Sequence, residues 1–102
     1  MDEVLDVLKR LGIPYAYDHF AEGESPEPPF ICYRMPESNN FSADGTAYFK
    51  VADVDLELYT DRKDPETEKK VERLLTDAGI FFDKQEVWIA EEKLYEVVFS
   101  FA

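Results

Sequence analysis

Two segments of the chain place hydrophobic residues at the spacing of an amphipathic helix. In residues 2–11, apolar side chains recur every three or four positions, and Gly12 stands where a left-handed glycine often ends a helix. The second segment begins at Asp64, a residue type that caps helix N-termini, and Pro65 suits the first helical position. Gly79 follows its last turn. We therefore predict one helix over residues 2–11 and a second that begins at Pro65.

The second predicted helix has one apolar face and one charged face. Its inner face is predicted to hold Thr67, Val71, Leu74, Leu75 and Ala78. Its outer face is predicted to hold Glu68, Lys69, Glu72 and Arg73. This division is typical of a helix that packs on a core and turns its other face to water.

Alternating or aromatic and β-branched segments predict five strands. Their ranges are 15–20, 30–35, 46–59, 81–90 and 94–101. Residues 21–29, AEGESPEPP, and 36–45, PESNNFSADG, are rich in proline, glycine and polar residues, so both are predicted as surface loops. The charged turn Glu91-Glu92-Lys93 joins the last two strands as a hairpin.

The longest alternation runs from Thr46 to Tyr59. One face of this strand is predicted to carry Tyr48, Lys50, Ala52, Val54, Leu56 and Leu58. The other face is predicted to carry Phe49, Val51, Asp53, Asp55, Glu57 and Tyr59. The strand therefore has one face suited to a core and one that holds a row of carboxylates.

The predicted element order is α-β-β-β-α-β-β. This order favours an α+β fold, with a mostly antiparallel sheet of four to five strands and two helices packed on one face. The chain of 102 residues is expected to form a single domain over residues 1–102. A domain of this size buries a limited fraction of its surface, so its stability is small. Self-association would add to that stability.

The charge balance changes the range of expected partners. Eleven Lys plus Arg stand against twenty-three Asp plus Glu, a formal net charge of −12, yet 15% of the residues are aromatic. A chain with that many large apolar side chains is expected to fold rather than to be a disordered acidic tail. The negative charge repels phosphate backbones and anionic lipid, so we expect no direct nucleic-acid or membrane partner.

The N-terminus and the cysteine content indicate a compartment. The segment MDEVLDVLKRLG is acidic from its start and contains no continuous apolar stretch, so we expect no signal peptide and no membrane span. One cysteine, Cys32, cannot form an intramolecular disulfide. An intracellular, reducing folding environment is the expectation.

Candidate catalytic chemistry is sparse. His19 and Cys32 are the single histidine and the single cysteine, and they lie on neighbouring predicted strands. No third group is in place to orient such a pair, and a cysteine in an apolar strand is usually a small buried hydrophobe. The phosphate-binding glycine motifs are missing from the sequence. We therefore predict no catalytic residue, no cofactor and no enzyme.

The carboxylates of the third strand have two readings. Asp53, Asp55 and Glu57 repeat with a period of two, which places them roughly 7 Å apart on one face. They can share a cation with neighbouring oxygens, although the spacings of Ca²⁺ loops and Zn²⁺ sites are missing. The favoured reading is a solvated face or a stripe that meets basic residues of another subunit. Phe41, an aromatic residue in a polar loop, either folds onto the core or inserts into a partner.

The second half of the chain resembles a family of small phage proteins. The resemblance is carried by three stretches: Leu58-Tyr59-Thr60-Asp61 before Lys63-Asp64-Pro65-Glu66, then Gly79-Ile80-Phe81, then Glu92-Lys93-Leu94-Tyr95-Glu96-Val97. These stretches resemble proteins encoded among the head–tail joining and tail genes of phages and prophages of Gram-positive bacteria. Such proteins are similar to tail-terminator or tail-completion proteins of long-tailed phages. The first half matches only by its size and element order.

The resemblance implies a structural virion assembly protein. Members of this family have a small α/β fold and form a hexameric ring that caps the tail tube and presents a surface for head–tail joining. Implied partners are further copies of the chain, the tail tube protein and the head connector or neck proteins. The implied location is the tail or neck of the virion, after assembly in the cytoplasm of the host bacterium. On this reading, Phe41, Asp53, Asp55 and Glu57 are candidate subunit or partner contacts.

Two other functions remain open. The high negative charge is compatible with an acidic DNA mimic or adaptor that acts on a nucleic-acid-binding protein of the host. Against this, the acidic residues are spread through all elements, as solvated faces usually are. The other alternative is a small metal-dependent enzyme that uses the carboxylates of the third strand.

Overall fold

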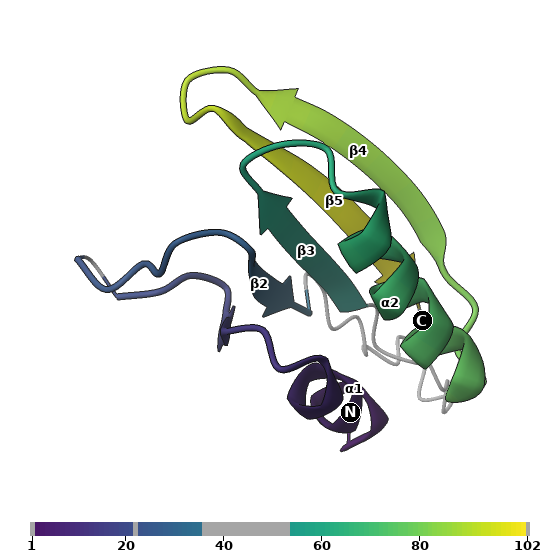
Figure 1. Cartoon of the computed structure of the whole chain (residues 1–102). Coiled ribbons are helices and arrows are strands. Elements are labelled where there is room, and N and C mark those ends of the chain that lie inside the picture. The colour runs from purple at the N-terminus through teal and green to yellow at the C-terminus, as the bar shows by residue number, and fades with distance from the viewer. Residues whose placement is uncertain (1, 22, 36–53, 102) are drawn as a thin grey trace, which may run out of the picture.

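The computed structural model describes residues 2–21, 23–35 and 54–101. Within these residues lie two helices and five strands in the predicted order (Figure 1). Their bounds are α1 Asp2–Leu11, β1 Tyr15–Tyr17, β2 Phe30–Arg34, β3 Val54–Thr60, α2 Pro65–Asp77, β4 Asp83–Ile89 and β5 Leu94–Phe101. The predicted α+β fold is confirmed.

The five strands form one mixed sheet in the order β1-β2-β3-β5-β4. β1 and β2 are parallel, and the other neighbouring pairs are antiparallel. β3 lies at the centre, where Leu56 is opposite Tyr33 of β2 and Phe99 of β5. The last two strands, β4 and β5, are a hairpin, as predicted.

Both helices pack on one face of this sheet. The core joins α1 and α2 to alternate residues of the strands, which places those strand residues on the same face. The buried hydrophobic members of this core are Val4, Val7, Leu8, Leu11, Ile31, Val54, Leu56, Leu58, Val71, Leu75, Val97, Phe99 and Phe101. The opposite face of the sheet, which we call the open face, turns away from both helices.

The ends of α2 follow from local chemistry. The Asp64 carboxylate accepts hydrogen bonds from the Thr67 backbone N–H at 3.2 Å and from the Thr67 hydroxyl at 2.7 Å. At the other end Gly79 has a φ of 77°, and Ile80 donates its N–H to the Leu75 carbonyl at 2.9 Å. This left-handed exit satisfies carbonyl groups that the helix leaves free. Both ends lie where the sequence predicts them.

Three strand predictions need correction or lie outside the described residues. β1 ends at Tyr17 rather than residue 20, because Asp18 has a φ of 66°, which breaks an extended strand. β4 begins at Asp83, two residues later than predicted, because Ile80 still belongs to the helix exit. Residues 46–53 of the predicted third strand lie outside the described part, and β3 begins at Val54.

Glu68 corrects the predicted faces of α2. It was expected on the outer face, yet only 2% of the residue is exposed. It lies three and seven positions before the buried Val71 and Leu75, which is the spacing of a single helix face. The Lys63 and Lys84 ammonium groups lie 2.9 and 2.8 Å from its carboxylate oxygens. Two cations therefore make burial of this carboxylate possible.

Candidate functional site

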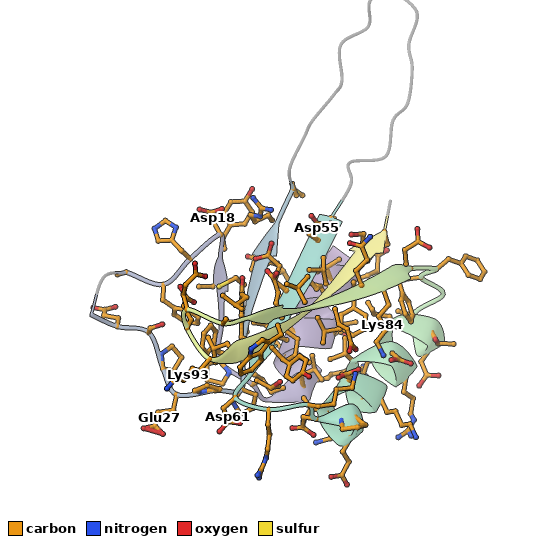
Figure 2. The ribbon with its side chains drawn as sticks, turned by 90° about the horizontal axis from the view of Figure 1, so that it is seen from above. Asp18, Glu27, Asp55, Asp61, Lys84 and Lys93 are labelled. Carbon is orange, nitrogen blue, oxygen red and sulfur yellow. The ribbon has the colours of Figure 1, made fainter. Side chains whose placement is uncertain are left out.

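The open face of the sheet carries polar and aromatic side chains that contact one another. Strand alternation places Arg34 of β2, Asp55 and Glu57 of β3 and Glu96 of β5 on this face, opposite to the core residues. Figure 2 shows the sheet with its side chains from above. Because strands fix side-chain positions more tightly than loops do, this face is a rigid surface.

The four residues predicted as contacts fall into two groups. Phe41 and Asp53 lie outside the described residues. Asp55 is half-buried on the open face, and its carboxylate accepts a hydrogen bond of 2.6 Å from the Ser100 hydroxyl of β5. Glu57 also lies on this face, two positions further along β3. A role of these residues in subunit contact stays a prediction.

Glu57 is not a solvated carboxylate, which corrects one expectation for the third strand. Only 8% of the residue is exposed, and the Arg34 Nε atom lies 3.2 Å from its Oε2 atom. Burial raises the pKa of Glu57 above that of an ordinary glutamate. Arg34 opposes the rise of this pKa, and the charge of Glu96 adds to it. The sequence pattern missed this burial because Arg34 reaches Glu57 only through strand pairing.

Tyr59 joins the two glutamates. Its hydroxyl oxygen lies 2.8 Å from Glu96 Oε2 and 3.2 Å from Glu57 Oε1. A phenol has one proton to donate, so the shorter contact is the stronger hydrogen bond to a carboxylate. Burial, followed by the bond to Glu96, raises the pKa of Tyr59, which keeps it a phenol at neutral pH. The ring stacks on Phe30 at a centroid distance of 5.1 Å.

A cavity of about 350 Å³ lies at one end of the open face. Strand residues and the connection from β1 to β2 form its walls. Its apolar and aromatic lining consists of Phe20, Phe30, Tyr59, Ile89 and Leu94. Its polar lining consists of Asp18, His19, Ser25, Cys32 and Glu92. We call it the acidic aromatic pocket, because aromatic rings and two carboxylates share its wall.

The first connection of the chain helps to form this pocket. Phe20 packs edge-to-face against Phe30, with ring centroids 5.5 Å apart. The left-handed Asp18 turns the chain at the end of β1, and the Asp18 N–H donates to the Tyr33 carbonyl at 2.8 Å. Sequence reasoning missed the pocket, although an Asp before an aromatic residue and a proline-rich stretch was a visible signal of a turn.

His19 and Cys32 both line the pocket, but they do not form a catalytic pair. The His19 Nδ1 atom lies 2.9 Å from the carboxylate of Asp18, and this histidine is exposed. Burial, with the charges of Glu57, Asp18 and Glu96, raises the pKa of Cys32 to about 11. A reactive cysteine needs the opposite shift, because the thiolate is the nucleophile.

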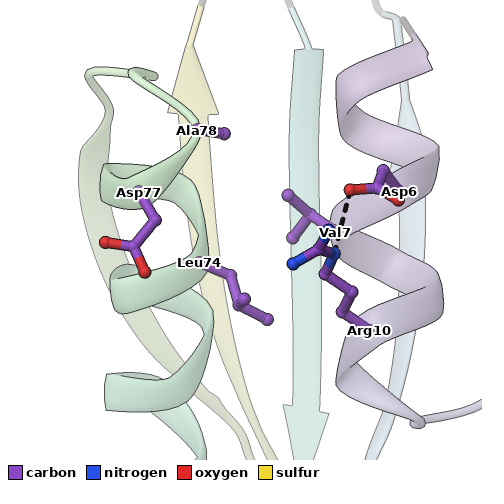
Figure 3. A pocket seen from close by; sticks show the side chains of 6 residues that line it. All are labelled: Asp6, Val7, Arg10, Leu74, Asp77 and Ala78. Atoms are coloured by element: carbon purple, nitrogen blue, oxygen red, sulfur yellow. Dashed lines mark ion pairs between the residues drawn. The ribbon is translucent and has the colours of Figure 1, made fainter.

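A second hollow of about 160 Å³ lies between the two helices. Figure 3 shows Leu74 of α2 directed toward α1, which carries Asp6, Val7 and Arg10. Arg10 forms an ion pair of 3.0 Å with Asp6, one turn away on its own helix. This hollow is a shallow groove of the helix layer, and its one cation is already paired.

Two further findings concern the described part of the chain. Within residues 2–21, 23–35 and 54–101, no three His, Cys, Asp or Glu side chains are grouped so that they could hold a metal ion. None of the helices described there has the length and apolar character needed to cross a membrane.

Comparisons with protein-family models, with curated proteins and with solved structures gave no match.

Proposed function

We propose that this chain is a structural, non-enzymatic virion assembly protein that caps a phage tail tube as a homo-oligomeric ring. In this role it presents a surface for head–tail joining, with the tail tube protein and the head connector or neck proteins as partners. The observation that carries the proposal is the open face, because it is a rigid sheet surface with charged and aromatic side chains locked to one another. Such a surface suits recognition of another protein.

The chemistry of the open face favours binding over catalysis. Two buried groups there, Cys32 and Tyr59, have raised pKa values, which keeps the thiol and the phenol neutral rather than nucleophilic. The hydroxyl of Tyr59 is held by two carboxylates. A nucleophile or general base needs a free and activated group.

The net charge supports controlled assembly. A charge of −12 on 102 residues makes free copies repel one another. A tube end with complementary charge offsets that repulsion, so the ring forms at the end of the tube. The three stretches that carry the resemblance lie at the start of α2, directly after its C-terminal end and at the start of β5. They therefore lie in or next to the regular elements of the fold.

Tube capping tests the proposal directly. The tail tube protein from the same genome is polymerised in vitro with and without the purified chain, and tube lengths are measured by negative-stain electron microscopy. We expect tubes that stop growing and carry a ring at one end. Unchanged growth and bare tube ends would contradict the proposed function.

The carboxylate stripe, which consists of Asp55 and Glu57 of β3, has a separate test. Asp55→Lys reverses a charge on the open face, whereas Asp55→Asn keeps an oxygen that accepts the Ser100 hydroxyl. If the stripe meets basic residues of a neighbour, light scattering should show the weakest association for the lysine variant and a smaller loss for the asparagine variant, which lacks the negative charge but adds no positive one. Equal masses for all three proteins would remove the stripe from the subunit interface.

A further inference from the structure

The acidic aromatic pocket has the chemistry of a site for a cationic side chain. Phe20, Phe30 and Tyr59 supply aromatic rings, and Asp18 and Glu92 supply carboxylates at its wall. A guanidinium group stacks on aromatic rings and pairs with carboxylates at the same time. A cavity of about 350 Å³ lies at the lower end of the range for ligand pockets and is large enough for one long side chain.

The charge around the pocket also favours a cationic side chain. Glu57, Asp18 and Glu96 all raise the pKa of Cys32, a residue of the pocket wall, so their negative charge reaches the cavity. Figure 2 shows Asp18, Glu27 and Lys93 on one side of the molecule and Lys84 on the other. The two carboxylates of the pocket wall, Asp18 and Glu92, outnumber Lys93, so the pocket stays acidic and a cation gains from entering it.

The chain itself carries cations that suit this pocket. Lys69, Lys70 and Arg73 of α2 are exposed, and their spacing of three and four positions places them along one side of the helix. In the described part of the chain, none of the three makes an ion pair or a hydrogen bond through its side chain. By contrast, Lys63 and Lys84 are both paired with carboxylates. We call the three residues the cationic ridge.

The fold keeps the cationic ridge and the pocket apart within one copy. α2 packs on the helix-covered face of the sheet through Val71 and Leu75. The pocket is lined by Phe30, Cys32 and Tyr59, whose register places them on the open face. A ridge on one face and a pocket on the other can meet only between copies, and a contact of this kind is head-to-tail.

We propose that the cationic ridge of one copy docks in the acidic aromatic pocket of the next, with the Arg73 guanidinium inside the pocket. This inference rests on the proposed function only in that the ring requires contacts between copies. The contact is heterologous, so its repetition builds a ring where the rotation between copies closes and an open helix where it does not, rather than a two-fold dimer. The second copy thus supplies the cation that the pocket lacks.

Charge reversal on each side of the contact tests the inference. Arg73→Glu alters the ridge, Glu92→Lys alters the pocket, and Lys9→Glu on α1 is a control with the same change of charge as Arg73→Glu. Sedimentation equilibrium measures the association of each protein over a concentration series at low salt. We expect association at least about tenfold weaker for the ridge and pocket variants and near wild-type association for the control.

A mixture of the two interface variants gives the sharper result. The Arg73→Glu protein keeps an intact pocket and the Glu92→Lys protein keeps an intact ridge, so one good contact forms per pair. An equimolar mixture should therefore associate more tightly than either variant alone, because this wild-type contact alternates with a charge-swapped contact whose two sides also attract each other. Assembly of Arg73→Glu protein equal to that of wild type would overturn the inference, and so would a wild-type protein that stays monomeric at every concentration and salt.

The tube-capping assay separates this inference from the proposed function. If wild-type and Arg73→Glu proteins cap tubes equally, the ridge–pocket contact is wrong and the capping function stands. If wild-type protein associates through the ridge and pocket but leaves tube growth unchanged, the contact stands and the capping function is wrong. Circular dichroism spectra of the variants confirm that each is folded.

Discussion

Glu68 and Glu57 are both buried glutamates, and their environments shift their pKa values in opposite directions. Glu68 lies between α2 and the sheet, where burial raises its pKa but Lys84 and Lys63 together outweigh burial and lower it. Glu57 lies on the open face, where burial and the nearby Glu96 outweigh its single cation, Arg34, and raise its pKa.

The difference shows how charges are distributed on the two faces of the sheet. The lysines around Glu68 also pair outward, Lys84 with Glu72 at 2.8 Å and Lys63 with Glu86, so α2 is tied to β4. On the open face, carboxylates outnumber cations around Glu57. Around Glu68 two lysines meet three carboxylates, whereas around Glu57 the single cation Arg34 meets Asp55, Glu57 and Glu96. The open face therefore keeps the larger negative surplus, which a partner can neutralise.

Removal of Glu68 should have the largest effect on stability. Glu68→Ala leaves two lysines without their shared buried carboxylate, and we expect a loss of about 2 kcal/mol in the free energy of unfolding. This is less than a fully buried pair would lose, because both lysines are partly exposed. Urea unfolding followed by circular dichroism measures the loss.

Glu66→Gln is the matched control, since Glu66 is an exposed glutamate of the same helix. Its effect should stay below about 0.5 kcal/mol. The lowered pKa of Glu68 means that its contribution is present above the ordinary glutamate pKa, about 4.3, and is lost as pH falls through its folded value. A Glu68→Ala protein as stable as wild type at neutral pH would show that the lysines do not need this carboxylate.

Tyr59→Phe should have an intermediate effect. It removes the hydroxyl that lies between Glu57 and Glu96 while it keeps the ring that stacks on Phe30. We expect a loss of about 1 kcal/mol in the free energy of unfolding, the usual value for one hydrogen bond, measured by urea unfolding. Tyr17→Phe serves as the comparison variant, because Tyr17 is an exposed tyrosine of β1 whose hydroxyl accepts a longer hydrogen bond of 3.3 Å from the Met35 N–H. Equal losses for both variants would count against a special role of the Tyr59 bridge.

Glu57→Gln should have the smallest effect, seen in the pH dependence of stability. A raised pKa means that the contribution of Glu57 is fully present below the ordinary glutamate pKa and is lost as pH rises through its folded value. The glutamine variant does not titrate. Its stability relative to wild type should therefore improve as pH rises from about 4.3 to 7. Thermal unfolding at several pH values tests this, and a relative stability that falls over that range would contradict the raised pKa.

Much of the fold could be predicted from the sequence, while the candidate site could be predicted only in part. The ends of α2 were predictable because Asp64 and Gly79 act on neighbouring backbone groups. Asp55 and Glu57 were correctly predicted to share one strand face, which follows from alternation alone. Their partners were not predictable, because Arg34 and Ser100 reach them from other strands.

The sequence by itself determined the order of elements, the caps of the helices and the alternation of the strands. These features depend on contacts within a few residues, so the residue types and their spacing in the sequence predict them. Only the tertiary structure decided that Glu68 is buried between two lysines, that Glu57 is buried beside another carboxylate, and that the first connection makes a pocket with residues of four strands. Each of these depends on strand register and packing, which bring charges from distant parts of the chain within a few ångströms of one another.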